Sequence, residues 1–302
     1  MNTPSLADLE RRLRMHVDVL AGDIGERNVA RPQALHTAAQ YIRTQWQALG
    51  YDVSVQEYLI DGIACSNLQA DPVAAERPDG IHVVGAHYDS ARGTPGADDN
   101  ASGVAALIEL SRAFAGCAGA RAPRFVAFVN EEQPYHGTAQ MGSAVYARAA
   151  RARGDAVRLM VALEMLGFYD PRAGTQAYPP GLKWFYPDTA DFIACVSDFG
   201  SRLELRRFAR ALRGTCTVPV EHLAAFRWVP GVSWSDHAAF WNAGYPAIMV
   251  TDTAFYRNPH YHTANDTPDT LDFGRLARVT DALHTALLDL LHRSPKRGRS
   301  DF

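Results

Sequence analysis

The chain has 302 residues, of which 47% are hydrophobic and 21% are charged. These fractions lie near the averages of globular proteins and exclude a disordered, collagen-like or coiled-coil chain. Lys and Arg number 30, and Asp and Glu number 33, which leaves a net charge of -3. Because no global basic field is present, we expect no nucleic-acid partner.

The first predicted elements are two amphipathic helices and a strand. Apolar residues recur at three- and four-residue spacing in residues 5–20 and again in residues 34–49, which places them on one face of each helix. Gly22 and Gly50 follow these patterns as helix stops. The sequence YDVSVQEYLI at residues 51–60 then predicts a strand at the edge of a sheet.

From Ile81 onward the chain contains four short, nearly continuous apolar runs, IHVVGA, RFVAFV, LMVAL and PAIMV. Such runs are typical of strands that are covered on both faces in a parallel sheet. This alternation with helices predicts an α/β fold with a mixed, mainly parallel central sheet and helices on both faces, a three-layer sandwich. The helical patterns cover residues 102–115, 141–152, 201–212 and 273–291.

We expect a single domain over residues 1–302, because no internal repeat or low-complexity linker divides the chain. Residues 1–60 are the N-terminal helices and edge strand of that domain. Residues 170–187, rich in Pro, Gly and aromatic residues, predict an ordered loop. Residues 292–302 predict a flexible basic tail.

Cysteine usage and hydropathy bear on the cellular location. The four cysteines form no CxxC pair, so we expect buried thiols rather than a pair that binds metal or cycles a disulfide. A disulfide between Cys195 and Cys216 is an alternative only if a leader sequence was removed. No apolar run reaches the roughly 18 residues of a membrane span, and the N-terminal residues lack the apolar core of a secretory signal. We therefore expect a cytoplasmic protein without a membrane partner.

Metal-capable side chains follow all four predicted buried strands. Because ligands of open parallel sheets bind beyond the carboxyl ends of the strands, we expect these side chains along one edge. They are His87 and Asp89 after the first run, Glu131 and Glu132 after the second, Glu164 after the third, Asp252, His260 and His262 after the fourth, and Asp98 and Asp99 before the helix expected at residue 102.

Each of these residues has a structural explanation on its own, such as a helix cap at Asp98. Together, however, crowded carboxylates would repel one another and lose hydration unless a cation neutralised them. Carboxylate and imidazole donors without a thiolate suit zinc, manganese or cobalt, with zinc the default. Two imidazoles and three carboxylates fit two ions bridged by one carboxylate, a site that hydrolyses amides or esters.

Other catalytic signatures are absent from the sequence. No HExxH helix, GxSxG turn, Walker loop or GxGxxG after a strand is present. The consecutive residues Ser235, Asp236 and His237 cannot form a catalytic triad, because neighbouring side chains seldom point at one another in the required order. We expect Asp236 and His237 to be structural or to support the ligands.

Six motifs stand in order along residues 81–291: GAHYDS, PGADDNASG, NEE, LEM, SDHAAFWNAGYPA and YHTANDTPDTL. Together they resemble the zinc-dependent aminopeptidase family with co-catalytic metals, which includes bacterial leucyl aminopeptidases and the catalytic domain of glutamate carboxypeptidase. The resemblance implies a zinc exopeptidase-like sandwich and an enzyme that acts on peptide or aminoacyl substrates.

The resemblance also implies a role for each matched ligand position. His87 and Glu164 would hold one zinc ion, Glu132 and His262 a second, and Asp99 would bridge the two Zn²⁺ ions. The implied reaction is hydrolysis by a hydroxide that both metals share.

Further positions take implied roles near these ligands. Glu131 would be the general base. Asp89 would accept the other ring N–H of the His87 ligand. The peptide bond between Asp99 and Asn100 matches one that is cis in relatives. Position 164 carries Glu where many relatives carry Asp.

Aminopeptidase action is favoured because a free α-amine can pair with an acidic group near the metals. Three alternatives are a carboxypeptidase, for which no Arg cluster can be assigned, a glutaminyl cyclase-like acyltransferase with one zinc, and a non-catalytic binding domain, which normally has broken ligand motifs. His260 could compete with His262, and Tyr256 and Tyr261 could stabilise the oxyanion or line the pocket. The aromatic residues expected at an apolar pocket rim are Phe168, Tyr169, Trp184, Phe185, Phe255 and Tyr256.

Overall fold

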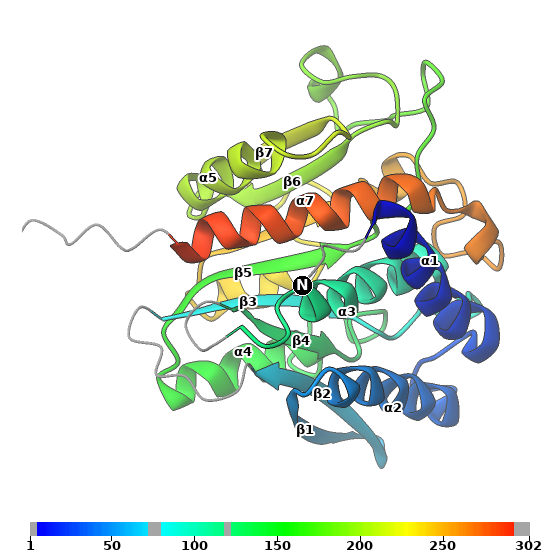
Figure 1. Cartoon of the computed structure of the whole chain (residues 1–302), viewed down its shortest axis with the longest axis vertical. Helices are drawn as coiled ribbons and strands as arrows, with labels where there is room; N and C mark the ends of the chain where they lie inside the picture. The colour runs from blue at the N-terminus through cyan, green and yellow to red at the C-terminus, as the bar shows by residue number, and fades with distance from the viewer. Residues whose placement is uncertain (1–4, 72–79, 118–121, 293–302) are drawn as a thin grey trace, which may run out of the picture.

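The computed structural model describes residues 5–71, 80–117 and 122–292. Within these residues the chain forms one eight-stranded sheet in the order β1-β2-β4-β3-β5-β8-β6-β7 (Figure 1). The strands are β1 (Asp52–Ile60), β2 (Ile63–Asp71), β3 (Ile81–His87), β4 (Arg124–Phe128), β5 (Val157–Glu164), β6 (Ile193–Asp198), β7 (Val220–Ala225) and β8 (Ala247–Thr251).

The predicted mixed, mainly parallel sheet is confirmed. The central strands β4, β3, β5 and β8 run parallel to one another, as their two-sided apolar pattern requires. The β1–β2 hairpin joins one side antiparallel to β4. At the other side β6 is antiparallel to β8 and parallel to the edge strand β7.

Helices cover both faces of the sheet, because each face is apolar and must be removed from water. One face packs against α1 (Leu6–Val17), α2 (Pro32–Ala48), α3 (Gly103–Ala113), α5 (Arg202–Arg213) and α7 (Phe273–His292). The other packs against α4 (Gly142–Arg153) and α6 (His237–Asn242). The short helical segments are η1 (Asp18–Ile24), η2 (Ala97–Ser102), η4 (Leu182–Trp184), η5 (Ala254–Tyr256) and η6 (Pro268–Thr270).

The observed elements differ from the predicted ones in a few places. The first helix continues through a wider π-helical stretch, η1, and stops at Gly25, which has φ 74°, so the prediction that Gly22 ends it is wrong. Strands β6 and β7 and helix α6 were not predicted. Edge strand β7 carries Glu221 and His222, which interrupt the apolar pattern by which a covered strand is recognised. The predicted tail at 292–302 lies outside the described residues, apart from His292, where α7 ends.

The described residues include all four cysteines and the helices whose length and hydropathy bear on membrane spanning. All four cysteines are free, with Cys65 and Cys195 buried and Cys117 and Cys216 partly buried, so the alternative Cys195–Cys216 disulfide is absent from the structure. None of the described helices combines the length and the apolar character needed to cross a bilayer.

Candidate metal centre

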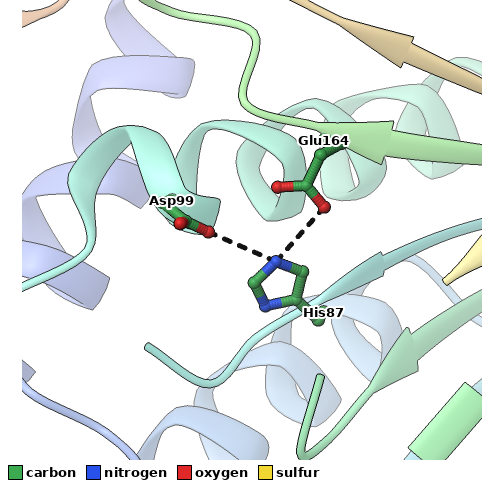
Figure 2. A group of neighbouring side chains, drawn as sticks. All are labelled: His87, Asp99 and Glu164. Atoms are coloured by element: carbon green, nitrogen blue, oxygen red, sulfur yellow. Dashed lines mark ion pairs between the residues drawn. The ribbon is translucent and has the colours of Figure 1, made fainter. Parts of the chain in front are cut away.

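The carboxyl ends of β3 and β5 bring His87 and Glu164 together beside Asp99, which lies in η2 directly before α3 (Figure 2). His87 Nε2 lies 3.3 Å from Asp99 Oδ1 and 3.3 Å from Glu164 Oε2. All three side chains are buried. These three residues form the first cluster, with one potential ligand atom from each within 4.8 Å of the others.

A second cluster shares Asp99 with the first. His262 Nε2 lies 3.1 Å from Asp99 Oδ2 and 3.2 Å from Glu132 Oε2. The ligand atoms of Asp99, Glu132 and His262 also lie within 4.8 Å of one another. Asp99 therefore directs one carboxylate oxygen to each cluster, and the structure brings together all the residues predicted to bind metal.

Asp266 holds the backbone around Asp99 in place. Its two carboxylate oxygens accept the backbone N–H groups of Asp98 and Asp99 at 2.8 and 3.1 Å. The peptide bond between Asp99 and Asn100 is cis, as the resemblance implied. Asp266 was not predicted as a site residue, although it lies four residues after His262 in the last of the six motifs.

Asp89 plays the same part for the loop after β4. Its Oδ1 accepts the backbone N–H of Glu131 and its Oδ2 that of Glu132, both at 3.1 Å. The predicted hydrogen bond to His87 is different in the structure, because Asp89 Oδ1 lies 3.6 Å from His87 Nδ1 while the Asp89 backbone oxygen lies at 3.2 Å. Asp89 thus positions the acidic pair as well as the imidazole.

Glu131 lies beside the clusters without belonging to either. Its Oε2 is 3.9 Å from His87 Nε2, and its Oε1 is 2.8 Å from Nδ1 of His136. This hydrogen bond, against the opposing effect of burial, raises the pKa of His136 to about 9. His136 was not predicted as a site residue, because it lies in the loop after β4, outside any of the six motifs.

Burial opposes ionisation of the glutamates at this site. It raises the pKa of Glu132 to about 8, with a further increase from the charge of Asp99. It raises the pKa of Glu164 to about 7, although the nearby His87 acts in the opposite direction. Burial alone would lower the pKa of His262, but hydrogen bonds to Asp99 and Glu132 raise it to about 10. The site is thus short of positive charge, which a divalent cation would supply.

The residues present fit such a cation. His87 Nε2 and Glu132 Oε1 are buried without a hydrogen-bond partner among the described residues, and each is an atom that can coordinate a metal. The donor set combines imidazole nitrogens with carboxylate oxygens and contains no thiolate. This combination matches the ligand preferences of zinc in hydrolytic sites.

An apolar pocket adjoins the first cluster, because Glu164 is one of its lining residues. The hollow measures about 850 Å³ including its open mouth. Of the six aromatic residues expected at the rim, Phe255 and Tyr256 line the pocket. The other four do not, and two of these, Trp184 and Phe185, are 75% and 79% exposed. The lining aromatics that were missed are Tyr178, Tyr186, Phe192 and Trp234.

The remaining candidate residues take supporting places. His260 packs edge-on against Phe168 and belongs to neither cluster. The hydroxyl of Tyr256 donates to the Pro230 backbone oxygen, whereas Tyr261 stacks on the ring of His262 with centroids 3.8 Å apart. In addition, Ser235 Oγ donates to Glu164 Oε2 at 2.6 Å. His237 and Asp236 are buried, as expected for residues with a structural part.

Comparison with known proteins gives matches along most of the chain. Residues 70–287 match the sequence profile of peptidase family M28. The uncharacterized protein YfbL of Escherichia coli K12 is 38% identical over 295 residues, which cover 95% of this chain and 90% of YfbL. Leucine aminopeptidase 1 of Fusarium vanettenii is 28% identical over 72% of this chain, which spans 54% of that longer protein.

Solved structures share the fold. The zinc aminopeptidase BSAP of Bacillus subtilis superposes with a TM-score of 0.72 at 16% identity, covering 93% of this chain and 95% of BSAP. A glutaminyl cyclase of Fimbriiglobus ruber superposes with a TM-score of 0.65 at 20% identity, covering 95% of this chain and 97% of the cyclase. From the profile match and the likeness to YfbL, the chain belongs to peptidase family M28 and is a metallopeptidase, a hydrolase acting on peptide bonds.

Proposed function

We propose that the chain is an aminopeptidase that binds two zinc ions and removes the N-terminal residue of peptides. His87 and Glu164 would hold one ion, Glu132 and His262 the other, and Asp99 both. The observation that carries this proposal is the division of the Asp99 carboxylate, with Oδ1 beside His87 and Oδ2 beside His262. A single ion would leave one of the two clusters with unneutralised buried carboxylates.

Two bound zinc ions would polarise the scissile carbonyl and acidify an attacking water. Glu131 would act as the general base. Its Oε2 lies next to the clusters, 3.9 Å from His87 Nε2. In the proposed reaction this oxygen accepts a proton from the attacking water and passes it to the leaving amine. His136 holds the other oxygen, Oε1, at 2.8 Å. Glu131 therefore keeps one oxygen free for proton transfer.

The charge of the pocket supports aminopeptidase over carboxypeptidase action. A carboxypeptidase needs a cation to bind the terminal carboxylate of its substrate. The side chains that line the pocket include no Arg or Lys, within the part of the chain that the structure describes. The acidic residues around the clusters instead suit the positive α-ammonium group of a free N-terminus.

The test combines metal analysis with a panel of chromogenic aminoacyl amides. We expect about two zinc ions per chain, hydrolysis of the amides, loss of activity on chelation and recovery with zinc. About one zinc ion per chain, together with cyclisation of N-terminal glutamine, would instead assign the glutaminyl cyclase-like activity whose fold the chain shares. Zinc-free protein that hydrolyses the amides equally well would contradict a metal-dependent mechanism.

A further inference from the structure

The floor of the pocket contains a row of paired residues that crosses four neighbouring strands. Glu164 on β5 pairs with Thr251 on β8, Thr251 pairs with Ala194 on β6, and Ala194 pairs with Glu221 on β7. Directly paired residues point to the same face of a sheet, and all four line the pocket. The row therefore joins the first cluster to a second carboxylate at the sheet edge.

The register also fixes the direction of the Glu221 side chain. Ala194 belongs to the core on the pocket face, whereas its neighbour Cys195 belongs to the core on the opposite face. Because side chains alternate along a strand, Glu221 points to the pocket face and the His222 side chain to the other. His222 also borders the pocket, where its backbone oxygen accepts the Tyr186 hydroxyl. Consistent with this, Arg213 on α5 contacts His222 Nδ1 at 3.4 Å.

Glu221 is available to a ligand. Among the described residues its side chain accepts no hydrogen bond and forms no ion pair, and it is only partly buried. The neighbouring polar groups are already engaged: the hydroxyl of Tyr178 donates to the Pro187 backbone oxygen and that of Tyr186 to the His222 backbone oxygen. The far end of the pocket thus presents a carboxylate without a partner.

The rings beside Glu221 are suited to a cation as well. Tyr178 and Tyr186 stack with centroids 5.9 Å apart, and burial raises the pKa of Tyr186, with a further increase from the charge of Glu221. Aromatic faces attract a positive group that lies over them. A long apolar stem would pack against Val196 and Met249 on the floor, while its charged end reaches the carboxylate.

The distances agree with a long side chain. Neighbouring strands lie about 4.8 Å apart, so three steps place the Glu221 backbone roughly 14 Å from that of Glu164. Thr251 and Ala194, which lie between the two glutamates in the row, have small side chains and line the pocket. An extended lysine side chain is roughly 6 Å long. Together with a reacting peptide group at the clusters it covers this span, whereas a leucine side chain ends short of Glu221.

We infer that Glu221 is the specificity-determining residue of the pocket and selects peptides whose N-terminal residue is lysine or arginine. The inference rests on the proposed function, because it places the N-terminal residue of the substrate in this pocket. It goes further by naming the substrate class: the α-ammonium group lies at the clusters and the side-chain cation at Glu221.

The test compares lysine, arginine, methionine and leucine p-nitroanilides on the zinc-loaded enzyme. Methionine is the neutral match for the length of lysine. We expect kcat/KM to favour lysine and arginine over methionine by about tenfold or more, the size of a charge-assisted hydrogen bond in a partly buried site, and mostly through KM. Glu221→Gln should abolish this preference. Glu57→Gln, at an exposed position on the opposite edge strand β1, is the matched control and should keep it.

A readout without turnover separates this inference from the proposed function. Lysinol and methioninol carry the two side chains but cannot be hydrolysed, and calorimetry should show tighter binding of lysinol that is lost in Glu221→Gln. Equal handling of lysine and methionine, or a preference that survives Glu221→Gln, overturns the inference and leaves the aminopeptidase proposal intact. If no amide is hydrolysed, the proposed function fails, and the two amino alcohols still decide whether Glu221 recognises a cation.

Discussion

Asp266 and Asp99 are joined through the backbone: Asp266 Oδ2 accepts the Asp99 N–H at 3.1 Å, and its Oδ1 accepts the preceding N–H, that of Asp98, at 2.8 Å. The carboxylate that both clusters share is therefore held by another buried carboxylate, from the loop that also carries His262. This loop contributes a candidate ligand and also the residue that orients the shared one.

We predict that Asp266→Asn weakens zinc binding, because the amide turns one acceptor oxygen into a donor that faces a backbone N–H. Loss of a residue that orients a ligand typically costs about 10- to 100-fold in metal affinity. Competition with a chromogenic chelator measures it. Asp269→Asn, at an exposed position in η6 close after Asp266, is the control and should bind zinc like the native protein. Native affinity in Asp266→Asn would show that the two hydrogen bonds do not position Asp99.

Glu131→Gln should retain zinc and lose most turnover. The amide keeps the shape of the side chain but cannot accept a proton, and general-base catalysis typically contributes about 10²- to 10⁴-fold. Metal content and kcat are measured on the same preparation. The contrasting variant is Asp99→Ala, which should lose the metal because both clusters use this residue. Full activity in Glu131→Gln would remove it as the base.

His136→Ala should lower kcat by about tenfold while zinc content and KM change little, because Glu131 loses the donor that holds its Oε1 at 2.8 Å. His136→Asn is the informative partner variant, since the Asn side-chain nitrogen can donate from nearly the same position as Nδ1. We expect it to recover part of the lost kcat. If both variants lose activity through KM alone, His136 contacts the substrate rather than the base.

We predict that the carboxylate of Glu109 stabilises the fold by an amount that depends on pH. Burial raises its pKa, but hydrogen bonds from His16, Arg12 and Arg112 outweigh this and lower the pKa from 4.5 to about 2. A carboxyl whose pKa is depressed by folding stabilises the protein above the unfolded pKa, and this stabilisation is lost as the pH falls toward the folded pKa. The loss should therefore occur between about pH 4.5 and pH 2.

The corresponding variant is Glu109→Gln, which should reduce the free energy of unfolding at pH 7 by roughly 3 kcal/mol and much less at pH 2 to 3. Urea unfolding in the presence of a chelator measures this difference without a contribution from zinc. Glu57→Gln, at an exposed position on β1, is the control and should change stability little at either pH. A constant difference between native protein and Glu109→Gln across this range would contradict the assigned pKa.

The strands that are buried on both faces of the sheet could be predicted from the sequence. Strands β3, β4, β5 and β8 are covered on both faces, so their apolar runs were evident in the sequence. Strand β7 lies at the sheet edge with one side partly open, and its polar residues hid it. Without β7 the row that ends at Glu221 could not be foreseen, because it depends on the strand order.

The pocket illustrates the same limit for aromatic residues. Trp184 and Phe185 were expected at the rim, but they are exposed outside it, whereas Tyr178 and Tyr186 from the same loop line the pocket. The loop is shaped by contacts such as the hydrogen bond from the Tyr178 hydroxyl to the Pro187 backbone oxygen. Residue type along the loop does not reveal which rings turn inward.

The sequence by itself determined the strand and helix periods and the kind of donor that follows each buried strand, because both are properties of residues that are neighbours in the chain. Tertiary structure alone decided how the Asp99 oxygens divide between two imidazoles, which backbone groups Asp89 and Asp266 hold, and that Glu221 shares a row with Glu164. These relationships join separate elements, and the distances between them are set by strand order, register and packing, which no local pattern encodes.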